Sequence, residues 1–172
     1  GITGPSTADR RLLTSTGDPS YDNHSHGGPT LFFAPDGTVT FNRDIFGSGH
    51  DPLVLDMDGD GFVEWLLGYE LLDHDTTPLW RFEPCPADDY DELEMHVDGA
   101  DIFWTADRKH RRIAFAASSF LYVLNHDGEL QWSRELVHPQ HVLFGYFCQD
   151  YELPQIFVLN KRDSLQLFNF HG

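Results

Sequence analysis

Nine consecutive residues carry oxygen ligands at alternate positions, in the order Asp-Met-Asp-Gly-Asp-Gly-Phe-Val-Glu from position 56. Asp56, Asp58, Asp60 and Glu64 offer carboxylates, and Phe62 offers its backbone carbonyl. A loop with this ligand set is of the kind that binds calcium. Four acidic side chains so close together would repel one another without a cation. A solvated acidic turn is the alternative, and the ligand spacing favours calcium.

The residues on either side of this loop predict strands. An EF-hand loop needs a glutamate at its twelfth position and a helix on each side. Leu67 stands at that position here. The flanking segments Pro52–Leu55 and Trp65–Leu67 are short and apolar, and Pro and Gly bound them, which is typical of strands. We therefore expect a strand, a calcium loop and a second strand.

Composition limits the class of protein and its partners. The chain has 172 residues, of which 40% are hydrophobic and 14% aromatic, as in a globular domain. Its net charge of −17 argues against nucleic acid and anionic membranes as partners, because both require a basic surface. We see no apolar run of about 18 residues or more that would predict a membrane span. Cys85 and Cys148 allow one disulfide without implying it.

An internal repeat organises the chain. The segment Leu72–Thr76 leading to Trp80 matches Leu124–Gly128 leading to Trp132, at a constant offset of 52 residues. A shared offset across apolar, turn and aromatic positions indicates a structural repeat. Four short strands in each repeat of about 40–50 residues are typical of a propeller blade.

The predicted fold is all-β, with β-propeller blades of four antiparallel strands. About three blades are present and the ring is incomplete, since propellers typically have about four to eight blades. We expect the remaining blades to come from a missing part of the chain or from another polypeptide. The predicted parts are a leader or loop at 1–29, an outer hairpin at 30–46, blades at 47–84 and 93–136, and a partial blade at 138–172.

Several of these motifs resemble known families. The calcium loop followed by Leu66–Gly68 resembles the repeat of FG-GAP propellers. Residues 49–56, 71–75 and 78–80, with His138–Val142 and Leu153–Phe157, more narrowly resemble rhamnogalacturonan lyases of the bacterial propeller type. This resemblance covers roughly residues 47–160. It implies a calcium-binding, extracytoplasmic enzyme that cleaves pectic backbones by β-elimination.

Histidines are the candidate catalytic residues. In a propeller the first strand of each blade lines the central channel, so residues that precede it face one end of that channel. Histidines fall just before these strands and are predicted to converge there, one from each blade: His50, His96, and either His138 or His141. Scattered, solvated histidines are the alternative. Two others, at the outer-hairpin turns, are expected to make turn hydrogen bonds beside tryptophans that pack the outer strands: His74, His126, Trp80 and Trp132.

Two further groups are candidate substrate contacts. The polar loop around His24 and His26 could contact a ligand, although loop histidines are commonly just solvated. Arg108 and Arg111 belong to the one basic cluster of an acidic chain, where they could bind a substrate carboxylate. A solvated basic loop is the alternative.

Two functions follow from these residues. In the first, a histidine removes a sugar-ring proton from an acidic polysaccharide, and calcium or an arginine neutralises the uronate carboxylate. In the second, a non-catalytic propeller uses calcium for rigidity and mediates protein or glycan interaction. The resemblance to calcium-loop propellers implies an extracytoplasmic location, where calcium is abundant enough to fill modest sites. The identity of the substrate lies outside the sequence.

Overall fold

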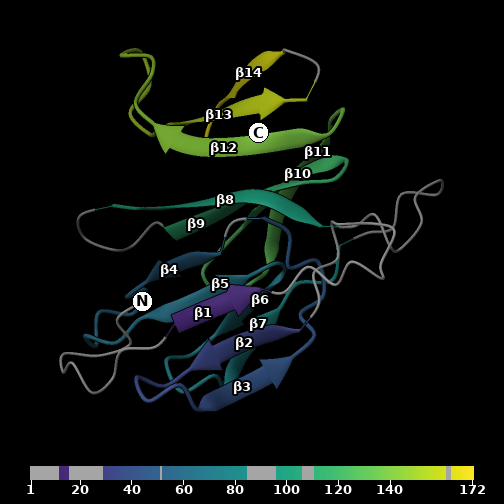
Figure 1. Cartoon of the computed structure of the whole chain (residues 1–172). Coiled ribbons are helices and arrows are strands. Elements are labelled where there is room, and N and C mark those ends of the chain that lie inside the picture. Colours follow the sequence, from purple (N-terminus) through teal and green to yellow (C-terminus); the bar gives the residue numbers. More distant parts are fainter. Residues whose placement is uncertain (1–11, 16–28, 51, 85–95, 106–110, 162–163) are drawn as a thin grey trace. The chain divides into compact units, whose positions relative to one another are not determined.

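The computed structural model describes residues 12–15, 29–50, 52–84, 96–105, 111–161 and 164–172 (Figure 1). Regular structure in this part of the chain is all β-strand, which confirms the predicted fold class. The strands form four antiparallel sheets. The chain divides into two compact units, one reaching to His96 and the other running from Val97 to Gly172. Over the described residues, no helix has the length and apolar character needed to cross a membrane.

The first sheet of the first unit has the strand order β1-β2-β3. It consists of β1 (Leu12–Ser15), β2 (Thr30–Phe33) and β3 (Val39–Arg43). The predicted leader or loop at 1–29 therefore contains one short strand, at Leu12–Ser15. Only four residues pair with β2 there, from Leu12 opposite Phe33 to Ser15 opposite Thr30. A four-residue strand without clear alternation of apolar and polar residues gives little local sequence signal. Its pairing with β2 satisfies backbone groups that the edge of the β2–β3 hairpin would otherwise expose.

The second sheet of the first unit has the order β4-β5-β6-β7, so each strand pairs with the next along the chain. The strands are β4 (Leu53–Leu55), β5 (Glu64–Leu67), β6 (Glu70–Leu72) and β7 (Pro78–Arg81). β5 and β6 are buried throughout, whereas β7 is largely exposed. This up-and-down order of four antiparallel strands is that of a propeller blade.

The core of the first unit lies between its two sheets. Phe32 of β2 is fully buried, and its ring centroid is 4.5 Å from that of Trp65 on β5. Leu67 and Leu72 belong to the same cluster. An ion pair also joins the sheets, because Arg43 of β3 donates to the Glu70 carboxylate of β6.

The first sheet of the second unit repeats the up-and-down order, as β8-β9-β10-β11. Its strands are β8 (Val97–Trp104), β9 (Arg111–Ala117), β10 (Phe120–Leu124) and β11 (Leu130–Glu135). The other sheet has three strands, β12 (Pro139–Gly145), β13 (Gln155–Asn160) and β14 (Leu165–Phe168), in that order.

The core of the second unit is formed where these two sheets face each other. Small side chains of β9 (Ala114 and Ala116) pack with branched ones of β12 and β13 (Val142, Ile156 and Val158). The Asp101 carboxylate of β8 also accepts a 2.7 Å hydrogen bond from the backbone N–H of Phe144 on β12. Burial raises the pKa of Asp101, and the backbone hydrogen bonds that it accepts oppose this shift.

One turn geometry recurs in both units and explains the sequence repeat. The N–H of Asp73 donates to the carbonyl of Thr77, and that of Asn125 donates to the carbonyl of Glu129. The fourth residue of each turn has a left-handed backbone, with φ of 76° at Thr76 and 81° at Gly128. The turn between β2 and β3 follows the same pattern, with φ of 85° at Gly37. The repeat is therefore a repeat of sheets that share an outer turn.

Candidate functional site

The acidic loop connects β4 to β5 in the first unit, between Leu55 and Glu64. Asp56 organises it, because its two carboxylate oxygens accept hydrogen bonds from the N–H groups of Gly59 at 2.5 Å and Gly61 at 3.1 Å. Both glycines have a left-handed backbone, with φ of 86° and 94°. Other residue types rarely adopt this conformation, so the glycines allow the chain to turn around the Asp56 side chain.

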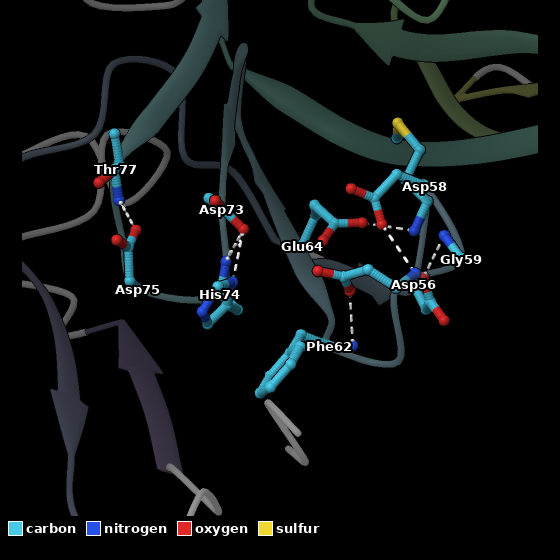
Figure 2. Close-up of polar contacts among 11 residues, drawn as sticks. Asp56, Asp58, Gly59, Phe62, Glu64, Asp73, His74, Asp75 and Thr77 are labelled. Atoms are coloured by element: carbon cyan, nitrogen blue, oxygen red, sulfur yellow. Dashed lines mark hydrogen bonds and ion pairs between the residues drawn. The ribbon is translucent and has the colours of Figure 1, made fainter. Parts of the chain in front are cut away.

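Three carboxylates of this loop converge. Asp56, Asp58 and Glu64 each place an oxygen within 4.8 Å of the other two. Figure 2 shows these side chains gathered beside the loop backbone. Asp58 is exposed, Asp56 is half-buried and Glu64 is only 2% exposed. The cluster therefore extends from solvent to the base of the loop.

Glu64 is the buried member of this cluster. One carboxylate oxygen accepts a hydrogen bond from the backbone N–H of Met57. Burial raises the pKa of Glu64, the Met57 hydrogen bond opposes this, and the charges of Asp58, Asp56 and Asp60 raise the pKa further. A buried carboxylate facing other carboxylates is costly without a cation, so the cluster is compatible with a bound metal ion.

The other two predicted ligands, Asp60 and Phe62, are not part of this cluster. Asp60 is exposed, and its carboxylate accepts a 2.8 Å hydrogen bond from the N–H of Phe62, two residues along the chain. This local bond draws its oxygen to the backbone, and Asp60 is not part of the three-carboxylate cluster. The Phe62 ring lies against the His74 ring, with centroids 4.5 Å apart. Ligation by Asp60 or by the Phe62 carbonyl stays a prediction.

Two of the outer-hairpin residues, His74 and Trp132, have the roles predicted for them, whereas the turn hydrogen bond of His126 and the packing of Trp80 stay predictions. His74 Nδ1 lies 2.7 Å from an Asp73 carboxylate oxygen, within the β6–β7 turn (Figure 2). His126 lies 3.5 Å from Asp127 in the equivalent turn. Trp132 packs against the core of the second unit and donates a 3.2 Å hydrogen bond to the carbonyl of Phe170.

The structure brings two of the candidate catalytic histidines together. His50 and His96 both belong to the first unit, and their ring centroids are 5.7 Å apart with the rings nearly perpendicular. His96 is buried and His50 is exposed. His138 and His141 belong to the second unit. Convergence of His50 and His96 with either of them stays a prediction.

His141 does not precede the first strand of its sheet. β12 begins at Pro139, so His141 lies inside the strand with an exposed side chain. The strand starts earlier than predicted because Pro139 pairs with Asn160, with a register shift before His141. A proline is tolerated at the first residue of a strand.

His138 has a partner that sequence reasoning missed. Its backbone is left-handed, with φ of 55°, and its carbonyl accepts a 3.0 Å hydrogen bond from the N–H of Lys161. Its Nε2 lies 3.6 Å from a carboxylate oxygen of Asp98, which is 5% exposed. A non-glycine residue in this conformation occurs preferentially at functional sites. An acidic residue among the apolar positions of a strand was the available signal for Asp98.

Of the predicted substrate contacts, only Arg111 lies in the described part of the chain. Arg111 begins β9 and is half-buried. The neighbouring Arg112 lies over the Phe170 ring at 5.3 Å, and burial lowers its pKa. Three other candidate residues lie outside the described part of the chain, so their roles stay predictions: His24, His26 and Arg108. Cys85 also lies outside it, so the disulfide that the two cysteines allow is not tested.

The fold and the loop define an all-β protein with blade-like sheets and an acidic cluster that is compatible with a bound metal ion. No protein-family model and no curated protein matches the sequence. Solved structures do match. The exotype rhamnogalacturonan lyase YesX has a TM-score of 0.56 at 17% identity over 84% of this chain. A rhamnogalacturonan lyase from Bacillus licheniformis has a TM-score of 0.58 at 19% identity over 85% of it.

These matches concern the fold. This chain covers 26% of the length of each lyase. BBS1N, solved in complex with ARL6DN, matches 97% of this chain with a TM-score of 0.50 at 8% identity. Proteins of different kinds therefore share this arrangement of strands, and function has to be argued from the site.

Proposed function

We propose that this chain is a calcium-stabilised, propeller-type module of an extracytoplasmic protein that binds acidic polysaccharide. The observation that carries the proposal is the convergence of Asp56, Asp58 and Glu64 within 4.8 Å, with Glu64 buried. Carboxylate oxygens are ligands for hard cations, and an irregular loop with flexible ligand number suits calcium better than magnesium. Extracellular calcium concentrations would keep such a site filled.

An acidic partner is compatible with an acidic chain only if cations offset the charge. The net charge of −17 disfavours direct approach of a polyuronate. Bound calcium would supply positive charge at the loop, and the half-buried Arg111 would supply it in the second unit. The structural similarity to two rhamnogalacturonan lyases supports a pectic glycan as the first ligand to test.

Catalysis by β-elimination is the finer form of this proposal, with His138 as the base. Its imidazole would take the proton from the carbon next to the uronate carboxylate. The carbon–oxygen bond to the leaving sugar then breaks, a carbon–carbon double bond forms, and the leaving oxygen takes up a proton. Asp98, 3.6 Å from Nε2, would stabilise the imidazolium. Arg111, which belongs to the same unit as His138, would neutralise the uronate carboxylate.

The test separates binding from catalysis. The protein is incubated with polygalacturonate and with rhamnogalacturonan in calcium or in chelator, and unsaturated uronate is followed by absorbance. The catalytic proposal expects turnover that is lost in His138→Gln and kept in the control His126→Gln. Calorimetric binding of either polymer without absorbance change would support a non-catalytic module. Absence of both signals in calcium would reject the polysaccharide proposal.

One observation favours protein interaction as a second candidate function. The connection between β12 and β13 exposes three aromatic side chains, each more than half accessible: Tyr146, Phe147 and Tyr151. The Gln155 side chain holds this connection, because it accepts hydrogen bonds from the N–H groups of Phe147 at 2.9 Å and Cys148 at 2.8 Å. Exposed aromatic residues on an ordered loop are typical of interaction surfaces.

A further inference from the structure

His50 is held by a tight turn that lies on the β5–β6 hairpin. The N–H of Ser48 donates to the carbonyl of Ile45, and φ is 65° at Gly47 and 53° at Gly49. A Cβ atom added to Gly68 would lie 2.5 Å from the carbonyl oxygen of Gly47. The backbone of the turn therefore sits directly on Gly68, which fixes the start of the segment that carries His50.

His96 is attached to the same hairpin. The hydroxyl of Tyr69, the residue after Gly68, lies 3.5 Å from the carbonyl oxygen of His96, as a long hydrogen bond. Tyr69 is 1% exposed, and its ring packs between Phe46 at 5.7 Å and Phe82 at 6.1 Å. Two histidines far apart in sequence are thus positioned by adjacent residues of one hairpin.

The two imidazoles have the separation of a metal-binding pair. A ring nitrogen of His50 lies within 4.8 Å of one of His96. Two nitrogens bound to one tetrahedral zinc ion, each at about 2.0–2.1 Å, would be about 3.4 Å apart. His96 is buried and His50 is exposed, so a small rotation of the exposed ring could close the difference. The pair therefore offers one fixed ligand and one adjustable ligand.

We propose that His50 and His96 bind a divalent transition metal of the zinc class. Imidazole nitrogen suits zinc, cobalt and nickel, whereas calcium prefers oxygen, so the first unit would hold two sites for different ions. Water or an anionic ligand would complete the coordination. The inference is independent of the polysaccharide proposal, because it uses neither the acidic loop nor His138.

The test is a calorimetric titration with zinc in calcium-containing buffer, using wild type, His50→Gln, His96→Gln and the control His126→Gln. We expect one binding event in wild type, weakened by about tenfold or more in each site variant and unchanged in the control. Circular dichroism in chelator checks that each variant is folded. Because His50 is exposed, we expect His50→Gln to fold even if His96→Gln does not, and His50→Gln alone still tests the pair. Cobalt titration gives a second readout through its visible absorption.

Two results would overturn the proposal. One is the absence of any zinc binding event in folded wild-type protein. The other is wild-type zinc affinity, and an unchanged cobalt spectrum, in His50→Gln. Loss of zinc binding in His126→Gln as well would assign the ion to surface histidines in general, and that outcome also contradicts the pair.

Discussion

Replacing Asp58 by alanine tests the acidic loop most directly. An ion that binds only the folded state, at 100 times its dissociation constant, stabilises that state by about 2.7 kcal/mol. For a chain of this size, about 1 kcal/mol corresponds to about 2–4 °C in Tm. Wild type should therefore melt about 5–11 °C higher in calcium than in chelator. Asp58→Ala removes one of three converging carboxylates, and this difference should disappear.

Without calcium, Asp58→Ala should leave Tm unchanged or raise it. Asp58 lies within 4.8 Å of both Asp56 and Glu64, and each like-charge pair costs about 1 kcal/mol at water-like screening. Removing Asp58 relieves two such pairs and loses one exposed hydrogen bond from the N–H of Asp60, at 3.0 Å. In chelator the variant should therefore melt at the wild-type temperature or slightly above it. A general loss of folding would lower Tm in both buffers.

Asp36→Ala is the matched control for this experiment. Asp36 accepts a 2.9 Å hydrogen bond from the N–H of Thr38 in an exposed turn, which resembles the bond between Asp58 and Asp60. This control should keep the full calcium-dependent difference. The measurement is differential scanning calorimetry at matched ionic strength. Equal Tm values in calcium and chelator for wild type would refute the site, and a full calcium response in Asp58→Ala would refute its ligand role.

Three further predictions address pH, packing and backbone conformation. The pKa of Glu64 is raised above its ordinary value of 4.5, so protonated Glu64 favours folding. In chelator, the free energy of unfolding should therefore fall as pH rises from about 4.5 through the folded-state pKa, and urea denaturation of Glu64→Gln should lack this fall. Ile156→Ala should cost about 2–5 kcal/mol by urea denaturation, because Ile156 is fully buried, whereas the exposed Leu165→Ala should stay within about 0.5 kcal/mol; equal effects would contradict the core assignment. Gly68→Ala should cost more than about 1–2 kcal/mol, because φ is 54° and the added Cβ meets backbone oxygens; a Tm equal to that of wild type would contradict this close approach.

The recurring outer turn was predictable because its determinants are local. Asp-Gly and Asn-His-Asp-Gly segments between β-prone runs indicate turns, and their spacing revealed the repeat. Thr76 stands where Gly128 stands in the next repeat, and the fold imposes a left-handed backbone on both. The register of the flanking strands, together with the turn hydrogen bonds, overrides the preference of threonine in that position.

The acidic loop was also readable from sequence, up to a limit. Alternate ligands and two glycines fit within nine residues, so the convergence of Asp56, Asp58 and Glu64 needs little beyond local geometry. The orientation of Asp60 was less certain, because its side chain can bond either to a cation or to the nearby N–H of Phe62. Cation binding and the local hydrogen bond to Phe62 both fit the same sequence pattern, so the pattern does not distinguish them.

Tertiary structure alone decided the contacts between distant segments. Leu12–Ser15 form a strand because they pair with β2. His138 has Asp98 as a partner because the second unit places the two side chains close together. His50 and His96 meet because both are fixed to one hairpin, through Gly68 and Tyr69. Residue type and periodicity fix which face of a strand is apolar and where a turn falls. The approach of two segments far apart in sequence depends on how whole sheets pack, and no local pattern encodes that packing.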